Sequence, residues 1–372
     1  MRVLVTGGGS GGHVNPAIAV ANTIRDNIRG AEIAFVGTER GIENKLVPKE
    51  GYKLYHIEIQ GIKRSLSLDN IKTLYLAYTS VIKAKKLIKE YKPDLVFGTG
   101  GYVCWPVIKA AAQLGIPTAL QECNAFPGFA VKMLEKYVDK IFINFEETKK
   151  HLKNPDKALR VGNPVRSEFM KYEHAKAKIE VGLDKYKTYI ISCGGSLGAE
   201  PINDASIEFM DKYVRNHPEV YHLLATGSLE YEAAKEKFNR HGLDKAENVK
   251  LVEYIYDMPL QMAAADLVIN RAGANTLAEL AVMKKPCVLI PSPYVPDNHQ
   301  YKNAKVLADV GAAVLIEEKE LAVDKFYNIL SELLSEDSRL MSLSENISGF
   351  AVYDTCKIIF KELTALAKNK KM

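Results

Sequence analysis

The chain has 372 residues, of which 47% are hydrophobic and 26% charged, and its formal net charge is +5. This length predicts two or three domains, and so much apolar side chain excludes an intrinsically disordered protein. The 25 glycines and 15 prolines follow no period, which excludes collagen-like and low-complexity classes. No apolar stretch reaches the roughly 18 residues that a membrane-spanning helix needs. A signal peptide is not expected either, because glycines interrupt the first apolar run after only a few residues.

The cysteines are odd in number and widely spaced, without a C-x-x-C pair. They predict neither a disulfide framework nor a cysteine-based zinc site, and they favour a reducing compartment, the cytosol. The five are Cys104, Cys123, Cys193, Cys287 and Cys356.

The first half of the chain alternates short apolar runs with stretches of helical spacing. The alternation predicts a parallel sheet covered by helices on both faces. The apolar runs are residues 3–6, 33–36, 95–97, 117–120 and 141–143, and residues 17–28 have helical spacing.

The first apolar run leads into the glycine loop VLVTGGGSGGH, whose residues 7–12 satisfy G-x-G-x-x-G. As a dinucleotide site, this pattern would use Glu39 to bind a ribose. The loop holds more glycine than that fingerprint needs, and His13 follows it directly. An imidazole at a helix N-terminus beside a glycine loop is a candidate general acid or base. The alternative is that His13 only caps the helix.

Residues 66–82 carry apolar side chains at helical spacing within a basic region. From residue 63 to residue 92 there are eight basic and two acidic side chains, so this stretch carries +6 and the remainder −1. The excess indicates one anionic partner surface and no general nucleic-acid binding. Either the helix packs its apolar face into the core, or it lies on the surface and contacts anionic lipid. The lipid-contacting residues would be Leu74, Tyr75, Tyr78, Lys83, Lys85 and Lys86.

Two further strand ends of the first half carry glycine or polar residues. Gly98 to Tyr102 follow the run at 95–97, and Glu122 and Asn124 follow the run at 117–120. Because the carboxyl ends of parallel strands meet at one edge of the sheet, these segments and the first loop predict a ligand cleft.

The strand–loop–helix pattern restarts in the second half of the chain. Apolar runs recur at 189–193, 221–225, 249–252, 267–269 and 287–290, and Gly-Gly-Ser begins at both Gly8 and Gly194. The repetition predicts two doubly wound α/β domains. We place their boundary near residues 162–164, where turn residues end a strand-like segment. A last helix at 353–368 is long enough to return to the first domain.

Three motifs of the second half suit a nucleotide sugar. Ser196, in Gly-Gly-Ser-Leu-Gly-Ala, can hold a pyrophosphate together with backbone N–H groups, although the Lys-Ser/Thr pair of a P-loop is absent. Glu279, one helical turn after Asn275 and close to Arg271, is placed to accept from two ribose hydroxyls; the alternative is a solvated helix glutamate. The third motif supplies many hydrogen-bonding side chains, namely Asp297, Asn298, His299, Gln300 and Asn303. No grouping shows metal-ligand spacing.

Eight sequence blocks, in order, strongly resemble the MurG family, the N-acetylglucosaminyltransferases that make lipid II. They are GGGSGGHVNPAIAVA, GTGGYVCWPVIKAA, GIPTALQECNAFPG, VGNPVR, CGGSLGA, YIYDM, ADLVINRAGANTLAEL and DNHQYKNA. The resemblance spans residues 7–304, and its specificity comes from the ordered set.

The resemblance implies an α/β protein with two doubly wound Rossmann-like domains facing each other across a cleft, the GT-B fold. Residues 1–163 would form the acceptor and membrane-facing domain, with a C-terminal helix in 350–372 packing back on it. Residues 164–349 would bind UDP-GlcNAc. The implied reaction is an inverting transfer of GlcNAc from UDP-GlcNAc to the 4-hydroxyl of MurNAc in undecaprenyl-pyrophosphoryl-MurNAc-pentapeptide, from lipid I to lipid II in peptidoglycan synthesis.

The motifs described above and the resemblance together assign residues to the substrates. His13 would be the catalytic base, and Gly101, Tyr102 and Glu122 would contact the acceptor. The UDP-GlcNAc-binding residues would be Ser10, Gly11, Gly12, Asn124, Arg166, Ser196, Ile255, Arg271, Ala274, Glu279, His299, Gln300 and Asn303. No metal and no tightly bound cofactor are expected.

The expected location is the cytoplasmic face of the bacterial cell membrane, as a peripheral protein. The expected partners are UDP-GlcNAc, lipid I and the anionic inner leaflet of the membrane. Nucleic acid is not expected as a partner, and other cell-wall synthesis proteins are candidate partners.

Two positions depart from the family pattern. Gln121-Glu122-Cys123-Asn124 stands where the family often has His-Glu-Gln-Asn, which would remove an imidazole from the acceptor side. Leu197 stands where a glutamine is frequent, which would remove a donor contact. Two alternatives stay open: an enzyme of different chemistry on the same scaffold, such as a nucleotide-sugar epimerase or a glycolipid synthase, and an NAD-dependent enzyme or non-catalytic nucleotide-binding module.

Overall fold

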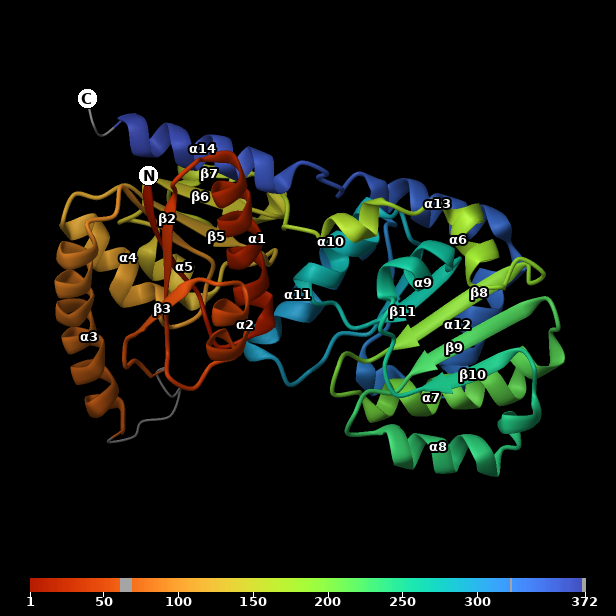
Figure 1. Cartoon of the computed structure of the whole chain (residues 1–372). Coiled ribbons are helices and arrows are strands. Elements are labelled where there is room, and N and C mark those ends of the chain that lie inside the picture. Colours follow the sequence, from red (N-terminus) through yellow and green to blue (C-terminus); the bar gives the residue numbers. More distant parts are fainter. Residues whose placement is uncertain (61–68, 322, 370–372) are drawn as a thin grey trace. The chain divides into compact units, whose positions relative to one another are not determined.

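A computed structural model of the chain describes residues 1–60, 69–321 and 323–369 (Figure 1). The start of the basic stretch, residues 63–68, lies outside this description, as do the side chains of residues 69–74, which include Leu74. The chain divides into two compact units. The first comprises Met1–Pro164 together with Val352–Met372, and the second comprises Val165–Ala351.

The described residues of the first unit form a seven-stranded sheet in which all neighbours are parallel. The strand order is β3-β2-β1-β4-β5-β6-β7, so the winding direction reverses between β1 and β4. The strands are β1 (Arg2–Thr6), β2 (Glu32–Gly37), β3 (Lys53–His56), β4 (Leu95–Gly98), β5 (Thr118–Glu122), β6 (Lys140–Ile143) and β7 (Ala158–Arg160).

Helices cover both faces of this sheet, as the alternation of apolar runs predicts. Successive strand residues point to opposite faces, so Val3 and Val5 pack in one core layer and Leu4 in the other. The Val3 layer contains α1 (Gly11–Asn27), α2 (Glu43–Lys49) and α14 (Thr355–Asn369), and the Leu4 layer contains α3 (Asp69–Tyr91), α4 (Cys104–Gln113) and α5 (Phe129–Leu134).

Helix α14 packs beside α1, although the whole second unit separates the two in sequence (Figure 1). Its buried face contributes Ile359, Leu363 and Ala367 to the core layer that also contains Val20 and Ile24 of α1. The C-terminal helix is therefore part of the first unit's core.

The second unit repeats the architecture with a parallel sheet of order β10-β9-β8-β11-β12-β13, reversed between β8 and β11. The strands are β8 (Thr188–Cys193), β9 (Val220–Ala225), β10 (Val249–Val252), β11 (Leu267–Asn270), β12 (Cys287–Leu289) and β13 (Val314–Leu315). The helices are α6 (His174–Glu180), α7 (Glu200–Lys212), α8 (Tyr231–Arg240), α9 (Met258–Ala264), α10 (Ala274–Val282), α11 (His299–Ala308), α12 (Val323–Ser335) and α13 (Asp337–Ser348).

The prediction of two doubly wound α/β domains is confirmed by these sheets. Two details differ from the sequence expectation. Helix α1 begins at Gly11 and thus includes the last two glycines of the first loop, whereas α7 begins at Glu200, after the second loop has ended. Ligands of such sheets bind at the carboxyl edge where the winding reverses, which directs attention to the loops after β1 and β4, and after β8 and β11.

Candidate functional site

Two glycine segments meet at the reversal point of the first sheet. Residues 7–12 follow β1 and residues 99–102 follow β4, and a Cβ added at Gly101 would lie 2.5 Å from the carbonyl oxygen of Gly8. The two backbones therefore touch in a way that only glycine allows. Gly101 also has a φ of +84°, in the left-handed region. Together these loops form one surface around the start of α1.

His13 lies in the first turn of α1 and is tied to the second glycine segment. Its Nδ1 is 2.9 Å from the carbonyl oxygen of Thr99, while the Thr99 hydroxyl donates to the His13 carbonyl oxygen at 2.8 Å. Because a carbonyl oxygen can only accept, Nδ1 carries the proton and the lone pair of the neutral ring is on Nε2. This tautomer suits a general base. The reading of His13 as a helix cap fails geometrically, because its ring bonds to another loop.

The other predicted residues of this loop surface lie beside His13 in the chain. Ser10 is exposed and is the N-terminal cap of α1, where its carbonyl oxygen accepts from the backbone N–H groups of His13 and Val14. Gly11 and Gly12 form the first turn, and Tyr102 is exposed after β4. Glu39, the ribose candidate of the dinucleotide interpretation, is exposed in the loop after β2.

The loop after β5 is organised around a buried carboxylate. Glu122 is 4% exposed and accepts from the backbone N–H groups of Asn124 at 2.9 Å and Gly128 at 2.7 Å. Burial raises the pKa of the Glu122 carboxyl, although these hydrogen bonds lower it. The structure thus gives Glu122 bonds within its own loop, where it holds Asn124 in place.

Position 121 is one of the two that depart from the family pattern. Gln121 is 2% exposed, and its amide Nε2 donates to Asn163 Oδ1 at 2.9 Å. The side chain lies inside the unit and joins β5 to the residues after β7. In this structure position 121 therefore serves the interior of the unit.

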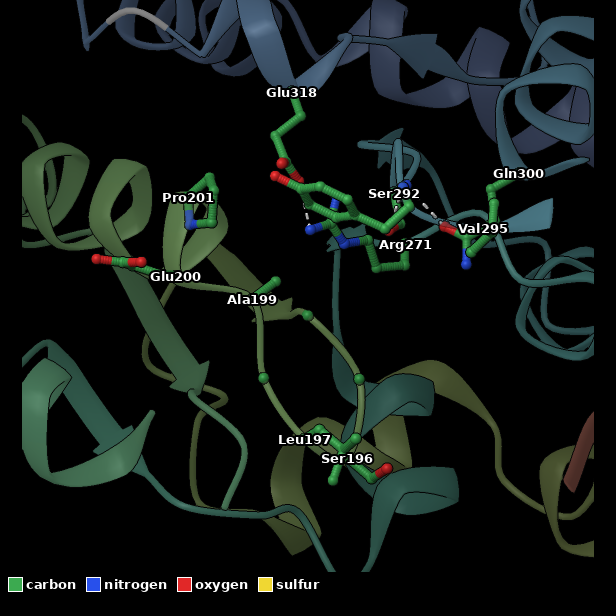
Figure 2. A pocket seen from close by; sticks show the side chains of 14 residues that line it. Ser196, Leu197, Ala199, Glu200, Pro201, Arg271, Ser292, Val295, Gln300 and Glu318 are labelled. Atoms are coloured by element: carbon green, nitrogen blue, oxygen red, sulfur yellow. Dashed lines mark hydrogen bonds and ion pairs between the residues drawn. The ribbon is translucent and has the colours of Figure 1, made fainter. Parts of the chain in front are cut away.

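The loop after β8 borders a cavity of about 520 Å³ at the reversal point of the second sheet (Figure 2). This volume is in the range of small-molecule sites. The cavity lies within the second unit and brings together Ser196, Arg271 and Gln300 from the predicted set, with Leu197, the position that departs from the family pattern, beside them. Its lining is Gly194, Gly195, Ser196, Leu197, Gly198, Ala199, Glu200, Pro201, Arg271, Ser292, Tyr294, Val295, Gln300 and Glu318.

Arg271 is the cation of this cavity, and its partner was missed from the sequence. Its guanidinium is paired with Glu318 at 2.5 Å (Figure 2). It also donates to the Ile290 carbonyl oxygen at 3.1 Å. Both side chains of the ion pair are nearly buried, at 12% and 11% exposure. Glu318 follows β13, a strand too short to predict, so no sequence signal placed it here. The ion pair fixes the orientation of the planar guanidinium, whose remaining N–H groups can donate to a phosphate.

Glu279 lies on α10, two turns from the loop after β11, and does not line the cavity. Burial raises its pKa to about 7, whereas the nearby charge of Arg166 lowers it. Arg166 is exposed, with its guanidinium 5.0 Å from the centre of the Phe169 ring. The structure therefore brings these two predicted residues together within the second unit.

Helix α11 carries three of the predicted residues, His299, Gln300 and Asn303. Gln300 accepts from the backbone N–H of Ser292 at 2.9 Å at the cavity wall, and His299 Nδ1 is 2.8 Å from the Pro296 carbonyl oxygen. Asn303, by contrast, is fully buried and donates to the Ala272 carbonyl oxygen. In this structure the Asn303 amide ties α11 to the loop before α10, and its contact with the sugar stays a prediction.

Two further predicted residues, Ala274 and Ile255, are buried. Ala274 is buried at the first position of α10, and Ile255 is 5% exposed between β10 and α9. Neither lines the cavity. Ile255 lies between two exposed tyrosines, Tyr254 and Tyr256, whose ring centres are 5.1 Å apart.

A second loop that the sequence reading missed supports the Ser196 loop. After β9, the backbone N–H of Ser228 donates to the Ser196 carbonyl oxygen, and that of Leu229 donates to the Leu197 carbonyl oxygen, both at 3.2 Å. Among the described residues, no group of three His, Cys, Asp or Glu side chains is arranged to hold a metal ion.

Comparison with known proteins gives a consistent result for both units. Residues 3–143 match the Glycosyltransferase family 28 N-terminal domain, and residues 189–358 match the Glycosyltransferase family 28 C-terminal domain. A curated protein of Thermoanaerobacter sp. (strain X514) is 43% identical over 98% of this chain and 100% of its own length. It is named UDP-N-acetylglucosamine–N-acetylmuramyl-(pentapeptide) pyrophosphoryl-undecaprenol N-acetylglucosamine transferase.

Solved structures extend the comparison. The crystal structure of Acinetobacter baumannii MurG has a TM-score of 0.80 and 26% identity, and the match covers 98% of this chain and 99% of that one. A UDP-GlcNAc 2-epimerase from Neisseria meningitidis has a TM-score of 0.68 with 16% identity, over 98% of this chain and 100% of that one. The second likeness shows a shared fold alone.

Proposed function

This chain belongs to the MurG family of N-acetylglucosamine transferases, and we propose that it transfers GlcNAc from UDP-GlcNAc to lipid I, giving lipid II in peptidoglycan synthesis. The observation that carries this proposal is the 43% identity to a curated transferase over 98% of the chain. The epimerase alternative has support at the level of the fold alone. The NAD alternative depended on one loop and on Glu39, which is exposed.

In the proposed mechanism the second unit binds the donor. The Ser196 loop supplies backbone N–H groups, and Arg271, held by Glu318, supplies a cation for the departing pyrophosphate. Arg166 adds positive charge near Glu279, and the Glu279 carboxylate accepts from the ribose hydroxyls. Gln300 contacts the GlcNAc from the cavity wall.

The first unit binds the acceptor and supplies the base. His13 Nε2 takes the proton of the MurNAc 4-hydroxyl as that oxygen forms a bond to C1 of GlcNAc. The bond from C1 to the UDP oxygen breaks in the same step, so UDP leaves with the electron pair and the configuration at C1 inverts. A single displacement needs no covalent nucleophile.

The activity is tested with purified protein, UDP-GlcNAc and a lipid-linked muramyl acceptor. We expect a disaccharide product whose proton NMR spectrum shows a β linkage. Incubation without acceptor is the control, because an epimerase would convert UDP-GlcNAc under that condition. An α linkage would contradict the single displacement, and epimerisation without transfer would contradict the proposed function.

We propose further that the protein binds the cytoplasmic face of the membrane through α3. None of the described helices is long and apolar enough to cross a bilayer. On α3, Tyr75, Tyr78 and Ile82 lie one or two turns apart and are 67%, 70% and 54% exposed. The alternative in which this stripe packs into the core is wrong for these three residues, because the core face of α3 is Val81, Ala84 and Ile88.

The flanking charges complete this proposed docking surface. Lys83, Lys86 and Lys89 are exposed and Lys85 is partly exposed, and Lys83 is also paired with Glu58 at 3.7 Å. Each basic residue near an anionic leaflet contributes about 1 kcal/mol, and salt screens the attraction. Tyrosine rings can insert at the headgroup level. Together these groups support reversible binding.

Vesicle sedimentation tests the α3 surface. Binding should require anionic lipid, weaken with salt, and fall when Lys83, Lys85, Lys86 and Lys89 are changed to Gln. The matched control changes four exposed lysines of the second unit, Lys171, Lys212, Lys235 and Lys250, to Gln. Equal losses in both variants would point to net charge alone, and salt-independent binding would contradict the proposal.

A further inference from the structure

A buried carboxylate lies against the first glycine loop and has no part in the mechanism above. Glu43, in the first turn of α2, is fully buried. Its Oε2 accepts from the backbone N–H of Gly9 at 2.9 Å, and its Oε1 accepts from the backbone N–H and the hydroxyl of Thr38, each at 2.9 Å. The side chain thus joins the loop after β1 to the loop after β2.

The surrounding backbone is shaped to admit this side chain. A Cβ added at Gly8 would lie 2.5 Å from Glu43 Oε1, one at Gly37 would lie 2.6 Å from its Cγ, and one at Gly41 would overlap its carboxyl. Burial raises the pKa of Glu43, but the hydrogen bonds from Thr38 and Gly9 lower it by a larger amount. The pKa of Glu43 therefore lies below its ordinary value. A charged, hydrogen-bonded carboxylate is a strong anchor.

The glycine loop needs anchors from outside itself. Residues 7–12 have one side chain, Ser10, which is exposed, so side chains of the loop itself do little to fix its conformation. On one side the loop is held by the backbone contact of Gly8 with Gly101. On the other side it is held by Glu43 through Gly9, four residues before His13.

We propose that Glu43 is a positioning residue for the transfer reaction. Its carboxylate holds Gly9, and so fixes the path of the chain into α1 and the place of His13. This inference rests on the proposed function and on the role of His13 within it. A displacement of about 1 Å in a reacting group can cost about 10²-fold in rate, so losing this anchor should act on the chemical step.

Glu43→Gln is the main test. The two oxygens accept from two different backbone N–H groups, so either orientation of the glutamine amide turns an NH₂ group against one of them. We expect kcat to fall by about 10- to 100-fold. We also expect UDP affinity, measured by calorimetry, to stay unchanged, because the groups that the proposed mechanism places on the donor, Ser196, Arg271 and Glu279, lie in the second unit.

Three variants accompany this test. Glu39→Gln changes an exposed glutamate of the same loop region and should behave as wild type. Thr38→Val removes the hydroxyl donor and keeps both backbone bonds, so kcat should fall less than about fivefold. Glu43→Asp keeps the charge but is one methylene too short to reach both loops, and it should lose about tenfold in kcat.

The outcomes separate the inference from the function it rests on. An inactive wild-type protein would overturn the proposed function. Wild-type activity with normal kcat in Glu43→Gln would overturn the positioning role alone. A variant that loses UDP affinity, melting temperature and kcat together would show a general structural role and would also overturn it. If Glu43→Gln does not fold, normal kcat in Glu43→Asp would overturn it.

Discussion

His13→Ala should lower kcat for GlcNAc transfer by about 10²- to 10⁴-fold, the usual loss when a general base is removed. The reason is the ring tautomer: Thr99 fixes the proton on Nδ1, so Nε2 is the basic nitrogen. Steady-state kinetics at saturating donor and acceptor measures the loss.

Asn15→Ala is the control for this variant, since Asn15 is an exposed neighbour on the same helix. A raised KM for UDP-GlcNAc with little change in kcat would assign His13 to the donor phosphates. Unchanged rate and unchanged donor binding would exclude both roles.

Glu279→Ala should weaken UDP binding by about ten- to hundredfold. Hydrogen bonds to a charged group contribute roughly 1.5–3 kcal/mol, which corresponds to that range of affinity. Calorimetric titration measures the affinity, and binding of the lipid acceptor should not change. Normal UDP affinity in the variant would show that this carboxylate does not hold the ribose.

The same residue predicts how UDP affinity depends on pH. Burial raises the pKa of Glu279 to about 7 in the free protein, although Arg166 lowers it. Ribose hydroxyls donate to the ionised carboxylate, so binding releases a proton, and affinity should rise from pH 6 through 7 and level off above pH 8. The terminal phosphate of UDP also titrates, at about pH 6. Glu279→Gln is therefore the control, because a glutamine does not titrate and any remaining pH dependence belongs to the phosphate. A wild-type slope no steeper than that of the variant would contradict the prediction.

The sheets were predictable because their strands are continuous apolar runs that end in glycine or polar residues. Val3 to Thr6 and Tyr189 to Cys193 are buried on both faces, and such strands are recognisable from composition alone. Strand β3 and strand β13 were missed. The first is a half-exposed edge strand rich in lysine and histidine, and the second has two residues, so neither forms an apolar run.

The site was predictable where the loop itself carries the signal, and unpredictable where partners come from elsewhere in the chain. Ser196 and Arg271 directly follow recognisable strands. Glu43 and Glu318 are far in sequence from the groups they bind, Gly9 and Arg271. Glutamates are mostly exposed to solvent, so nothing in the sequence marks these two as buried partners. The burial of Gln121 and Asn303 depends on which elements pack over them. The residues adjacent to them in sequence carry no sign of this packing.

Helix α14 sets an order on the folding of a chain that is still being synthesised. Residues 165–351 are synthesised between the two pieces of the first unit. At about 5–20 residues per second, α14 therefore follows the first piece after a delay of roughly 10–40 s. The second unit is continuous and can close its core as it emerges. Val20 and Ile24 must wait for Ile359 and Leu363, so the first unit is completed last. A premature stop after residue 351 would therefore expose an apolar groove beside the helix that carries His13.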